Sequence, residues 1–240
     1  MAEKDSRLIT ALDVNTLQEV QQITTELGNL VHCYKVGMQL YYSQGNAVIA
    51  YLKEQNKAVF LDLKLHDIPN TVAKSAMVLT RLGVDLLTVH ALGGPTMLRT
   101  VCNATREEAA RLGTIPPKIL AVTILTSMNQ NQLNQIGCPS AVDQEVLKLA
   151  SLAQTSGVDG VVASPQEACQ IRQQCGSDFL IVTPGIRPIG AALNDQSRVA
   201  SPAQAIADGA THLVVGRPII AAQDRRLAAQ QIWDEMGNVQ

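Results

Sequence analysis

The chain has 240 residues, of which 46% are hydrophobic but only 3% are aromatic, so its core must be built mainly from aliphatic side chains. A net charge of -2 gives no electrostatic reason to expect nucleic acid or an anionic membrane surface as a partner. The first ten residues carry charges early, and no apolar run approaches membrane-spanning length, so we expect no secretory signal, no membrane insertion and a cytoplasmic protein.

Short β-branched runs alternate with longer amphipathic stretches along the whole chain. We predict eight strands, at residues 7–14, 33–38, 58–65, 86–91, 118–125, 160–164, 179–186 and 212–219. Helix-like segments lie between them, for example at 14–28, 71–83 and 143–157. Apolar strands separated by helices indicate a parallel sheet covered on both faces. No linker or low-complexity segment interrupts the pattern, so we expect residues 1–240 to form one domain.

Eight such units in a chain of this length favour an α/β fold of the (β/α)₈ TIM barrel type. The alternative is an open doubly wound sheet, which usually has fewer strands and often a GxGxxG turn. The sequence contains no GxGxxG, GxxxxGK[ST], GxSxG or HExxH motif. We therefore predict the closed barrel.

Five cysteines are scattered along the chain without CxxC or Cys/His metal-binding spacing: Cys33, Cys102, Cys138, Cys169 and Cys175. A catalytic cysteine would need a basic partner that lowers the pKa of its thiol, and the sequence points to none. We expect reduced, mostly buried thiols and no metal site.

Polar residues occupy the C-terminal ends of most predicted strands, where barrels carry their catalytic groups. They are Asp13, Lys35, Asp62, Lys64, His90, Thr126, Ser127, Arg187, Gly216 and Arg217. Each has a structural alternative: Asp13 could cap a helix, and Lys35 could extend to the rim. For His90 taken alone, a buried structural histidine is the better interpretation. The convergence of so many polar groups favours a functional site.

The strand at residues 58–65, AVFLDLKL, contains two charges in an apolar run. Asp62 and Lys64 are two residues apart, so we expect both side chains to point into the barrel. Leu61, Leu63 and Leu65 should then pack outward against the helices. Because a buried ion pair is a weak stabiliser, we interpret the pair as part of a functional site.

The loops after the seventh and eighth strands carry the segments TPGIRP and VGRPI. Barrels frequently bind phosphate at this place. Gly185 and Gly216 let backbone N–H groups approach an anion, and Arg187 and Arg217 can donate to its oxygens. The loop between Pro188 and Pro202 is long for such a connection and is typical of a lid. The sequence therefore predicts a phosphorylated substrate.

The sequence resembles the orotidine 5′-monophosphate decarboxylase family over its whole length. The segments ALDV, YKVGM, FLDLKLHDIPNT, VHA, LTSM, TPGIRP, DQ and VGRPI occur in the family's order, and DLKLHDIPNT is the most specific of them. The resemblance implies a lyase without cofactor or metal that converts orotidine 5′-monophosphate to uridine 5′-monophosphate and carbon dioxide, the last step of pyrimidine nucleotide synthesis.

The resemblance also implies roles for individual residues. Lys64 matches the proton donor, within a charged network that includes Lys35, Asp62 and Asp67. Asp67 and the stretch from Ile68 to Thr71 match positions that reach the neighbouring subunit's site, which implies a homodimer. The implied binding positions are Asp13, Lys35 and Thr71 at the ribose, Thr126 and Ser127 at the pyrimidine, Pro184 in the TPGIRP segment, and Arg187, Gln196, Gly216 and Arg217 at the phosphate.

Two alternatives remain open at this point. A relative that shares DxKxxD, such as 3-keto-L-gulonate 6-phosphate decarboxylase or hexulose phosphate synthase, would use the acidic residues with Mg²⁺, although lysines beside them compete with the metal's charge. A non-catalytic nucleotide-binding barrel belongs to a different class and would need no proton donor. The sequence leaves open whether His66 and His90 act directly or only support their neighbours.

Overall fold

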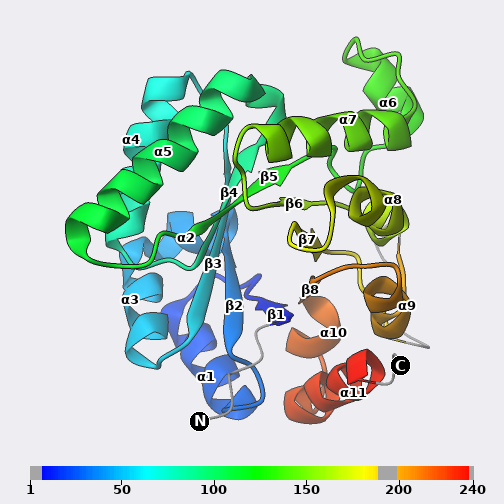
Figure 1. The fold of residues 1–240 in the computed structure, drawn as a ribbon. Helices are drawn as coiled ribbons and strands as arrows, with labels where there is room; N and C mark the ends of the chain where they lie inside the picture. The colour runs from blue at the N-terminus through cyan, green and yellow to red at the C-terminus, as the bar shows by residue number, and fades with distance from the viewer. Residues whose placement is uncertain (1–6, 189–198, 238–240) are drawn as a thin grey trace.

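The computed structural model describes residues 7–188 and 199–237, so Gln196 and most of the long loop lie outside the described residues. In the described part, eight parallel strands form a closed barrel in which each strand pairs with the next and β8 pairs with β1 (Figure 1). The strands are β1 (Leu8–Ala11), β2 (Cys33–Gly37), β3 (Ala58–Leu65), β4 (Leu86–His90), β5 (Lys118–Val122), β6 (Gly160–Val162), β7 (Leu180–Thr183) and β8 (His212–Val215). The predicted barrel is confirmed.

Helices surround the barrel and follow the strands in chain order (Figure 1). They are α1 (Leu17–Leu27), α2 (Met38–Gln44), α3 (Asn46–Glu54), α4 (Pro69–Arg81), the 3₁₀ turn η1 (Ala91–Gly93), α5 (Gly94–Leu112), α6 (Gln130–Gln135), α7 (Val142–Thr155), α8 (Pro165–Cys175), α9 (Pro202–Ala207), α10 (Arg217–Ile220) and α11 (Arg225–Gly237). Within residues 7–188 and 199–237, no helix is both long and apolar enough to cross a membrane.

Several predicted strands were too long at their C-terminal ends. The strand predicted at 118–125 ends at Val122, and the strand predicted at 212–219 ends at Val215. The apolar run continues past each end, because Ile124 is buried beyond β5 and Ile219 is buried in α10. Hydrophobic pattern alone cannot distinguish a strand residue from a buried residue in the loop that follows it.

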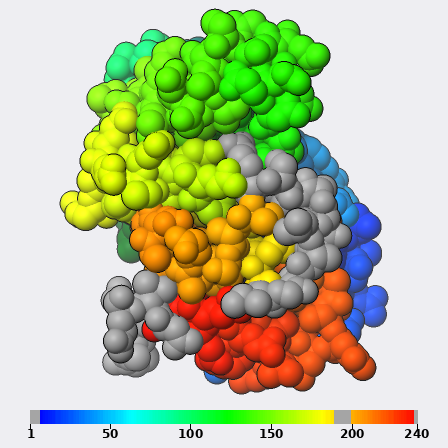
Figure 2. Space-filling view, turned by 90° about the vertical axis from the view of Figure 1, so that its right-hand side faces the viewer, coloured from blue at the N-terminus to red at the C-terminus, as the bar shows by residue number. Residues whose placement is uncertain are grey.

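The ring of helices closes between its first and last members. The indole Nε1 of Trp233 in α11 donates to the backbone oxygen of Leu30 at 3.0 Å, and Arg225 Nη1 donates to Glu26 Oε2 at 2.7 Å. Figure 2 shows the side formed by the C-terminal part, where colours follow one another from green through yellow and orange to red. Successive units are therefore neighbours on the surface as well as in the sheet.

The apolar side chains divide into two clusters. A small cluster lies among the inward-facing side chains of the strands and includes Ile9, Phe60 and Leu120. A much larger cluster lies between the sheet and the helices. Leu61 and Leu63 belong to this outer cluster, and Leu65 packs against it as a partly buried residue. The predicted outward orientation of these leucines is confirmed.

The N-terminal end of the barrel is fastened by a repeated hydrogen bond. In each case the residue before an even-numbered strand accepts, through its side chain, from a backbone N–H of the preceding odd-numbered strand. The pairs are Val59 N to Asp85 Oδ2 at 2.7 Å, Ile119 N to Asp159 Oδ2 at 2.8 Å, and Ile181 N to Thr211 Oγ1 at 2.9 Å. These polar side chains thus satisfy backbone donors at the end opposite the predicted site.

Strand β3 is irregular where its charges lie. Its pairing with β4 runs from Leu61 opposite Leu87 directly to Leu65 opposite Val89, so β3 advances four residues (61 to 65) while β4 advances two (87 to 89). Lys64 has a φ of +52°, in the left-handed region that non-glycine residues rarely adopt. The regular alternation assumed from the sequence is therefore wrong between Asp62 and Lys64, because a bulge intervenes. Both side chains nevertheless reach the same pocket.

The conformation of Lys64 predicts an unusual order of stability among its variants. Lys64→Gly should be more stable than Lys64→Ala by about 1 kcal/mol, because glycine adopts positive φ without the clash of a Cβ atom. Urea denaturation of both variants measures the difference. At Leu65, which follows the bulge without a positive φ, the glycine variant should instead be the less stable of the two. A Lys64→Gly variant less stable than Lys64→Ala would contradict the strained conformation.

Candidate active site

A pocket with a volume of about 250 Å³ opens at the C-terminal ends of the strands, close to the lower end of the usual range for small-molecule sites. It is where a barrel is expected to carry its functional groups. Ten residues predicted from the sequence line it: Asp13, Lys35, Asp62, Lys64, Thr126, Pro184, Gly185, Arg187, Gly216 and Arg217.

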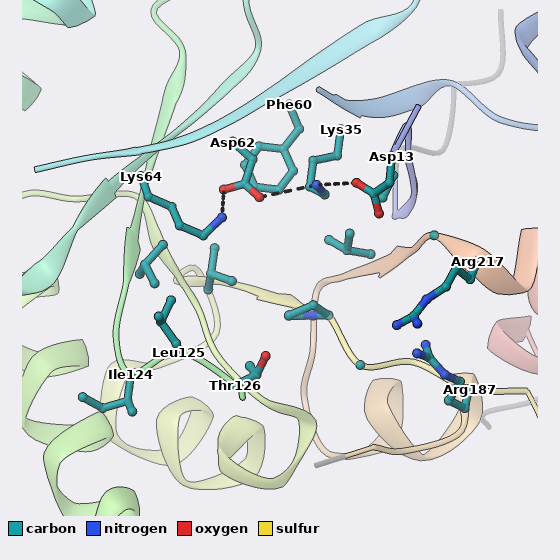
Figure 3. A pocket seen from close by; sticks show the side chains of 17 residues that line it. Asp13, Lys35, Phe60, Asp62, Lys64, Ile124, Leu125, Thr126, Arg187 and Arg217 are labelled. Carbon is teal, nitrogen blue, oxygen red and sulfur yellow. Dashed lines mark hydrogen bonds and ion pairs between the residues drawn. The ribbon is translucent and has the colours of Figure 1, made fainter. Parts of the chain in front are cut away.

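Four charged side chains of alternating sign form a row along one wall of the pocket (Figure 3). Lys64 Nζ donates to Asp62 Oδ1 at 2.9 Å. Lys35 Nζ lies 3.5 Å from Asp62 Oδ2 and 3.5 Å from Asp13 Oδ1. The row therefore reads Asp13, Lys35, Asp62, Lys64, and each interior member contacts a charge of opposite sign on both sides.

Asp62 is the most deeply buried member of this row, with 12% of its side chain exposed. Burial by itself raises the pKa of this carboxyl, but the charges of Lys35 and Lys64 and the hydrogen bonds from Lys64 and Thr88 outweigh it. The pKa of Asp62 consequently lies below its usual value. Asp62 is a carboxylate at neutral pH, and it holds both ammonium groups beside the pocket.

Two arginines lie at the other end of the pocket. Arg187 follows β7 and is buried, and its Nη1 donates to the backbone oxygen of Ile186 at 2.8 Å. Arg217 begins α10 directly after β8, and Figure 3 shows its guanidinium group pointing toward that of Arg187. Two fixed guanidinium groups facing one space form a site for an anion with several oxygens, such as a phosphate.

Glycines give this end of the pocket its shape. Gly185 has a φ of +79°, which lets the chain turn after β7 toward Arg187. At Gly216 a Cβ atom would lie 3.1 Å from Asp13 Oδ2. A larger residue there would push against the first member of the charged row, so glycine keeps β1 and β8 close at this place.

Part of the pocket lining is an apolar wall. Its side chains carry neither a charge nor a hydrogen-bonding group, and the sequence did not single them out as site residues. They are Ala11, Phe60, Val122, Ile124, Leu125, Val162 and Val214. The spacing along each strand could have identified some of them, because Phe60 lies two residues before Asp62 on the same face of β3. Such a wall suits a flat ring.

Four predicted residues in the described part do not line the pocket of their own chain: Asp67, Ile68, Thr71 and Ser127. All of them are exposed. Asp67 Oδ1 accepts from the backbone N–H of Ile68 at 2.6 Å, at the start of α4. The implied contact between Asp67 and Lys64 is therefore not made within one chain and stays a prediction for an assembly. Gln196 lies outside the described residues.

His66 and His90 stack on each other beside this site, with ring centroids 5.1 Å apart and an angle of 21° between the rings. Burial, followed by the charges of His66 and Lys64, lowers the pKa of His90 to about 4. His90 is therefore neutral near pH 7. Neither ring lines the pocket.

No cluster of three or more His, Cys, Asp or Glu side chains suited to a metal ion occurs in the two described segments. All five cysteines are free thiols, and Cys33, Cys102 and Cys175 are buried. Burial raises the pKa of Cys102 to about 11, which leaves its thiol protonated at neutral pH.

Comparisons with known proteins agree with this arrangement. A family model described as "Orotidine 5'-phosphate decarboxylase / HUMPS family" matches residues 6–232. A protein of Heliobacterium modesticaldum named orotidine 5′-phosphate decarboxylase is 50% identical over 235 residues, covering 98% of this chain and 97% of its own length. A protein of Moorella thermoacetica with the same name is 47% identical over 237 residues, covering 98% and 94%.

A solved structure is similar over the same extent. The crystal structure of orotidine 5′-phosphate decarboxylase from Lactobacillus acidophilus matches with a TM-score of 0.86 and 41% identity, covering 97% of this chain and 99% of that chain. The family model, the sequence relatives and the solved structure all extend over nearly the whole chain. The chain belongs to the orotidine 5′-phosphate decarboxylase / HUMPS family.

Proposed function

We propose that this protein converts orotidine 5′-monophosphate to uridine 5′-monophosphate and carbon dioxide without a cofactor. The observation that carries the proposal is the row Asp13, Lys35, Asp62, Lys64 along one wall of the pocket, with two arginines at its far end. The substrate's ring and its carboxylate would lie at Lys64, and its phosphate at Arg187 and Arg217. The relatives' names support the same substrate.

The reaction requires a fixed cation at the reacting carbon. Loss of carbon dioxide from C6 of the pyrimidine leaves an electron pair in the plane of the ring, where the π-system cannot absorb it. Many decarboxylases solve this problem with pyridoxal phosphate or thiamine as an electron sink. In this pocket the ammonium of Lys64 would stabilise the developing carbanion and then donate the proton to C6.

Asp62 would face the carboxylate that leaves. Two like charges about 4 Å apart repel by roughly 4 kcal/mol at an effective dielectric constant near 20. Catalysis of slow reactions must supply on the order of 20 kcal/mol, so repulsion can account for only a small part. Stabilisation of the carbanion by Lys64, held in place by the surrounding charges, must supply most of the remainder.

The Mg²⁺-dependent relatives are a poorer match to this site. In those enzymes carboxylates act with Mg²⁺ to stabilise an enediolate. Here Asp62 Oδ1 accepts from Lys64 and Asp62 Oδ2 faces Lys35, so ammonium groups occupy both oxygens that a magnesium ion would need. A decarboxylase that uses the ammonium group itself fits these contacts better.

The direct test is to follow the ultraviolet absorbance of orotidine 5′-monophosphate during incubation with the protein in EDTA. We expect turnover by the wild-type protein and none by Lys64→Ala. The circular dichroism spectrum of Lys64→Ala should match that of the wild type, which shows that the fold is retained. Activity that disappears in EDTA and returns with Mg²⁺ would favour the metal-dependent relatives. Tight binding of uridine 5′-monophosphate without any turnover would favour a nucleotide-binding protein.

Arg217 should matter for the rate although it never contacts the reacting carbon. Binding energy at the phosphate can position the ring against Lys64. We expect Arg217→Ala to lower kcat/KM by roughly 10- to 100-fold, the effect of losing hydrogen bonds to a charged group. Arg99→Ala, which removes an exposed arginine from α5, is the matched control and should keep its kcat/KM. A near-normal kcat/KM for Arg217→Ala would exclude phosphate anchoring.

A homodimer is the second part of the proposal. One face of α4 carries residues at helical spacing from its N-cap to its last turn: Ile68, Thr71, Ser75 and Val78. Ile68 and Val78 are 65% and 51% exposed. Such a partly apolar face supports contact with a second copy. Asp67 and Thr71 would then reach the pocket of the partner from the edge of this face.

Mixed dimers test whether Asp67 serves the other chain. Lys64→Ala and Asp67→Ala should each be inactive, but a dimer that contains one of each would have one site with both native residues. Random reassortment of equal amounts by co-expression should therefore restore about a quarter of wild-type activity. If Asp67 acts in its own chain, both sites of the mixed dimer are defective and no activity returns. The double variant Lys64→Ala/Asp67→Ala mixed with Lys64→Ala is the negative control.

Two further predictions from the sequence belong to this proposal. We propose that the chain is a single domain, supported by a barrel that closes between β1 and β8. A cytoplasmic location, where pyrimidine nucleotide synthesis would have its substrates, also stays a proposal.

A further inference from the structure

Thr88 lies in the middle of β4, directly behind the charged row. It is fully buried and does not line the pocket, so we expect no direct contact between Thr88 and the substrate. Its Oγ1 accepts from the backbone N–H of Lys64 at 2.8 Å and donates to Asp62 Oδ1 at 3.0 Å. One hydroxyl group therefore joins the two residues on which the chemistry would depend.

The bulge in β3 explains why a side chain takes part. Asp62, Leu63 and Lys64 all lie between the paired residues Leu61 and Leu65, opposite Thr88 alone. The backbone N–H of Lys64 has a side-chain acceptor here in place of a ladder carbonyl, and an unsatisfied donor at this depth would be unfavourable. The hydroxyl of Thr88 thus supports the positive φ that turns Lys64 into the pocket.

The direction of both hydrogen bonds follows from the donors available. A backbone N–H can only donate, so Thr88 Oγ1 must accept from Lys64. Its single hydroxyl proton is then free to point at Asp62 Oδ1, which accepts because the carboxyl is ionised. Asp62 Oδ1 receives donors from both Thr88 and Lys64 Nζ, whereas Oδ2 faces Lys35. These contacts fix the plane of the carboxylate.

We propose that Thr88 is a positioning residue for this reaction, whose hydroxyl fixes the Asp62 carboxylate and the backbone of Lys64 at the same time. The proposal rests on the function proposed above for Asp62 and Lys64. Valine has nearly the shape of threonine but neither donates nor accepts a hydrogen bond. Serine keeps the hydroxyl and loses only the methyl group that stiffens the rotamer.

The main test compares Thr88→Val with Thr88→Ser. We expect kcat on orotidine 5′-monophosphate to fall roughly 10- to 100-fold in Thr88→Val, the size of effect that follows from small displacements of reacting groups. Thr88→Ser should recover most of the rate. The affinity for uridine 5′-monophosphate, which would be bound through its phosphate and ribose, should stay within about threefold of wild type in both variants.

A matched control separates positioning from general destabilisation. Thr105 is equally buried, but its hydroxyl donates only to the backbone of its own helix, at Val101 and Cys102. Thr105→Val should leave kcat unchanged. If Thr88→Val does not fold, Thr88→Ala and Thr88→Ser form a second pair that differs by the hydroxyl oxygen, and the same loss and recovery are expected.

The titration of Asp62 gives a readout that needs no turnover. The hydrogen bond from Thr88 stabilises the ionised carboxylate, so its loss should raise the pKa of Asp62, and the ionised form should disappear at a higher pH as the solution is acidified. ¹³C NMR of aspartate labelled at the side-chain carboxyl, assigned with Asp62→Asn, measures this change.

The outcomes separate this proposal from the proposed function. A wild-type kcat in Thr88→Val, or an equal loss in Thr88→Ser, overturns the role of the hydroxyl while leaving the decarboxylase intact. If the wild-type protein does not decarboxylate orotidine 5′-monophosphate, the proposed function fails. The NMR titration then still tests the role of Thr88. A raised pKa of Asp62 in Thr88→Val supports a hydroxyl that holds the carboxylate, and an unchanged pKa of Asp62 overturns it.

Discussion

The carboxylate of Asp62, held between two ammonium groups, is the interaction on which the rest of the site depends. A buried carboxylate without a partner would lose its free energy of hydration without compensation. The same holds for a buried lysine without a partner. Together the charges compensate one another, because each interior charge has an opposite charge on both sides. The row holds the ammonium group of Lys64 beside the pocket. A reaction through a ring carbanion requires a cation at this place.

The barrel makes this arrangement possible at small cost in stability elsewhere. Its N-terminal end uses Asp85, Asp159 and Thr211 to satisfy backbone donors, and its outer face buries leucines against the helices. The polar side chains that line the pocket at the C-terminal end take no part in these contacts of the N-terminal end. The exception is the bulge at Lys64, where the backbone itself departs from a regular strand and a threonine from the neighbouring strand satisfies it.

The two sides of the pocket suit different parts of a substrate. The arginines can bind a phosphate at the side of the pocket opposite Lys64, while the apolar wall accepts a flat ring without adding charge. One member of the predicted charged network, Asp67, does not line the pocket of its own chain. It is exposed just before α4. A site that is completed across a subunit interface would couple activity to assembly.

The sequence by itself determined the class of fold and predicted most of the polar residues that line the pocket. Eight apolar runs separated by helices specify a barrel, and the charges at strand ends follow from where a barrel carries its chemistry. Strand spacing could have identified Phe60, two residues before Asp62, but not the rest of the apolar wall, since Ile124 looks like any core residue until the pocket is closed around it. Nor could it identify the bulge or the role of Thr88. Regular alternation assumes an ideal ladder, whereas the register between β3 and β4 is set by the packing of the whole barrel, and only the tertiary structure decides which hydroxyl meets which unpaired N–H.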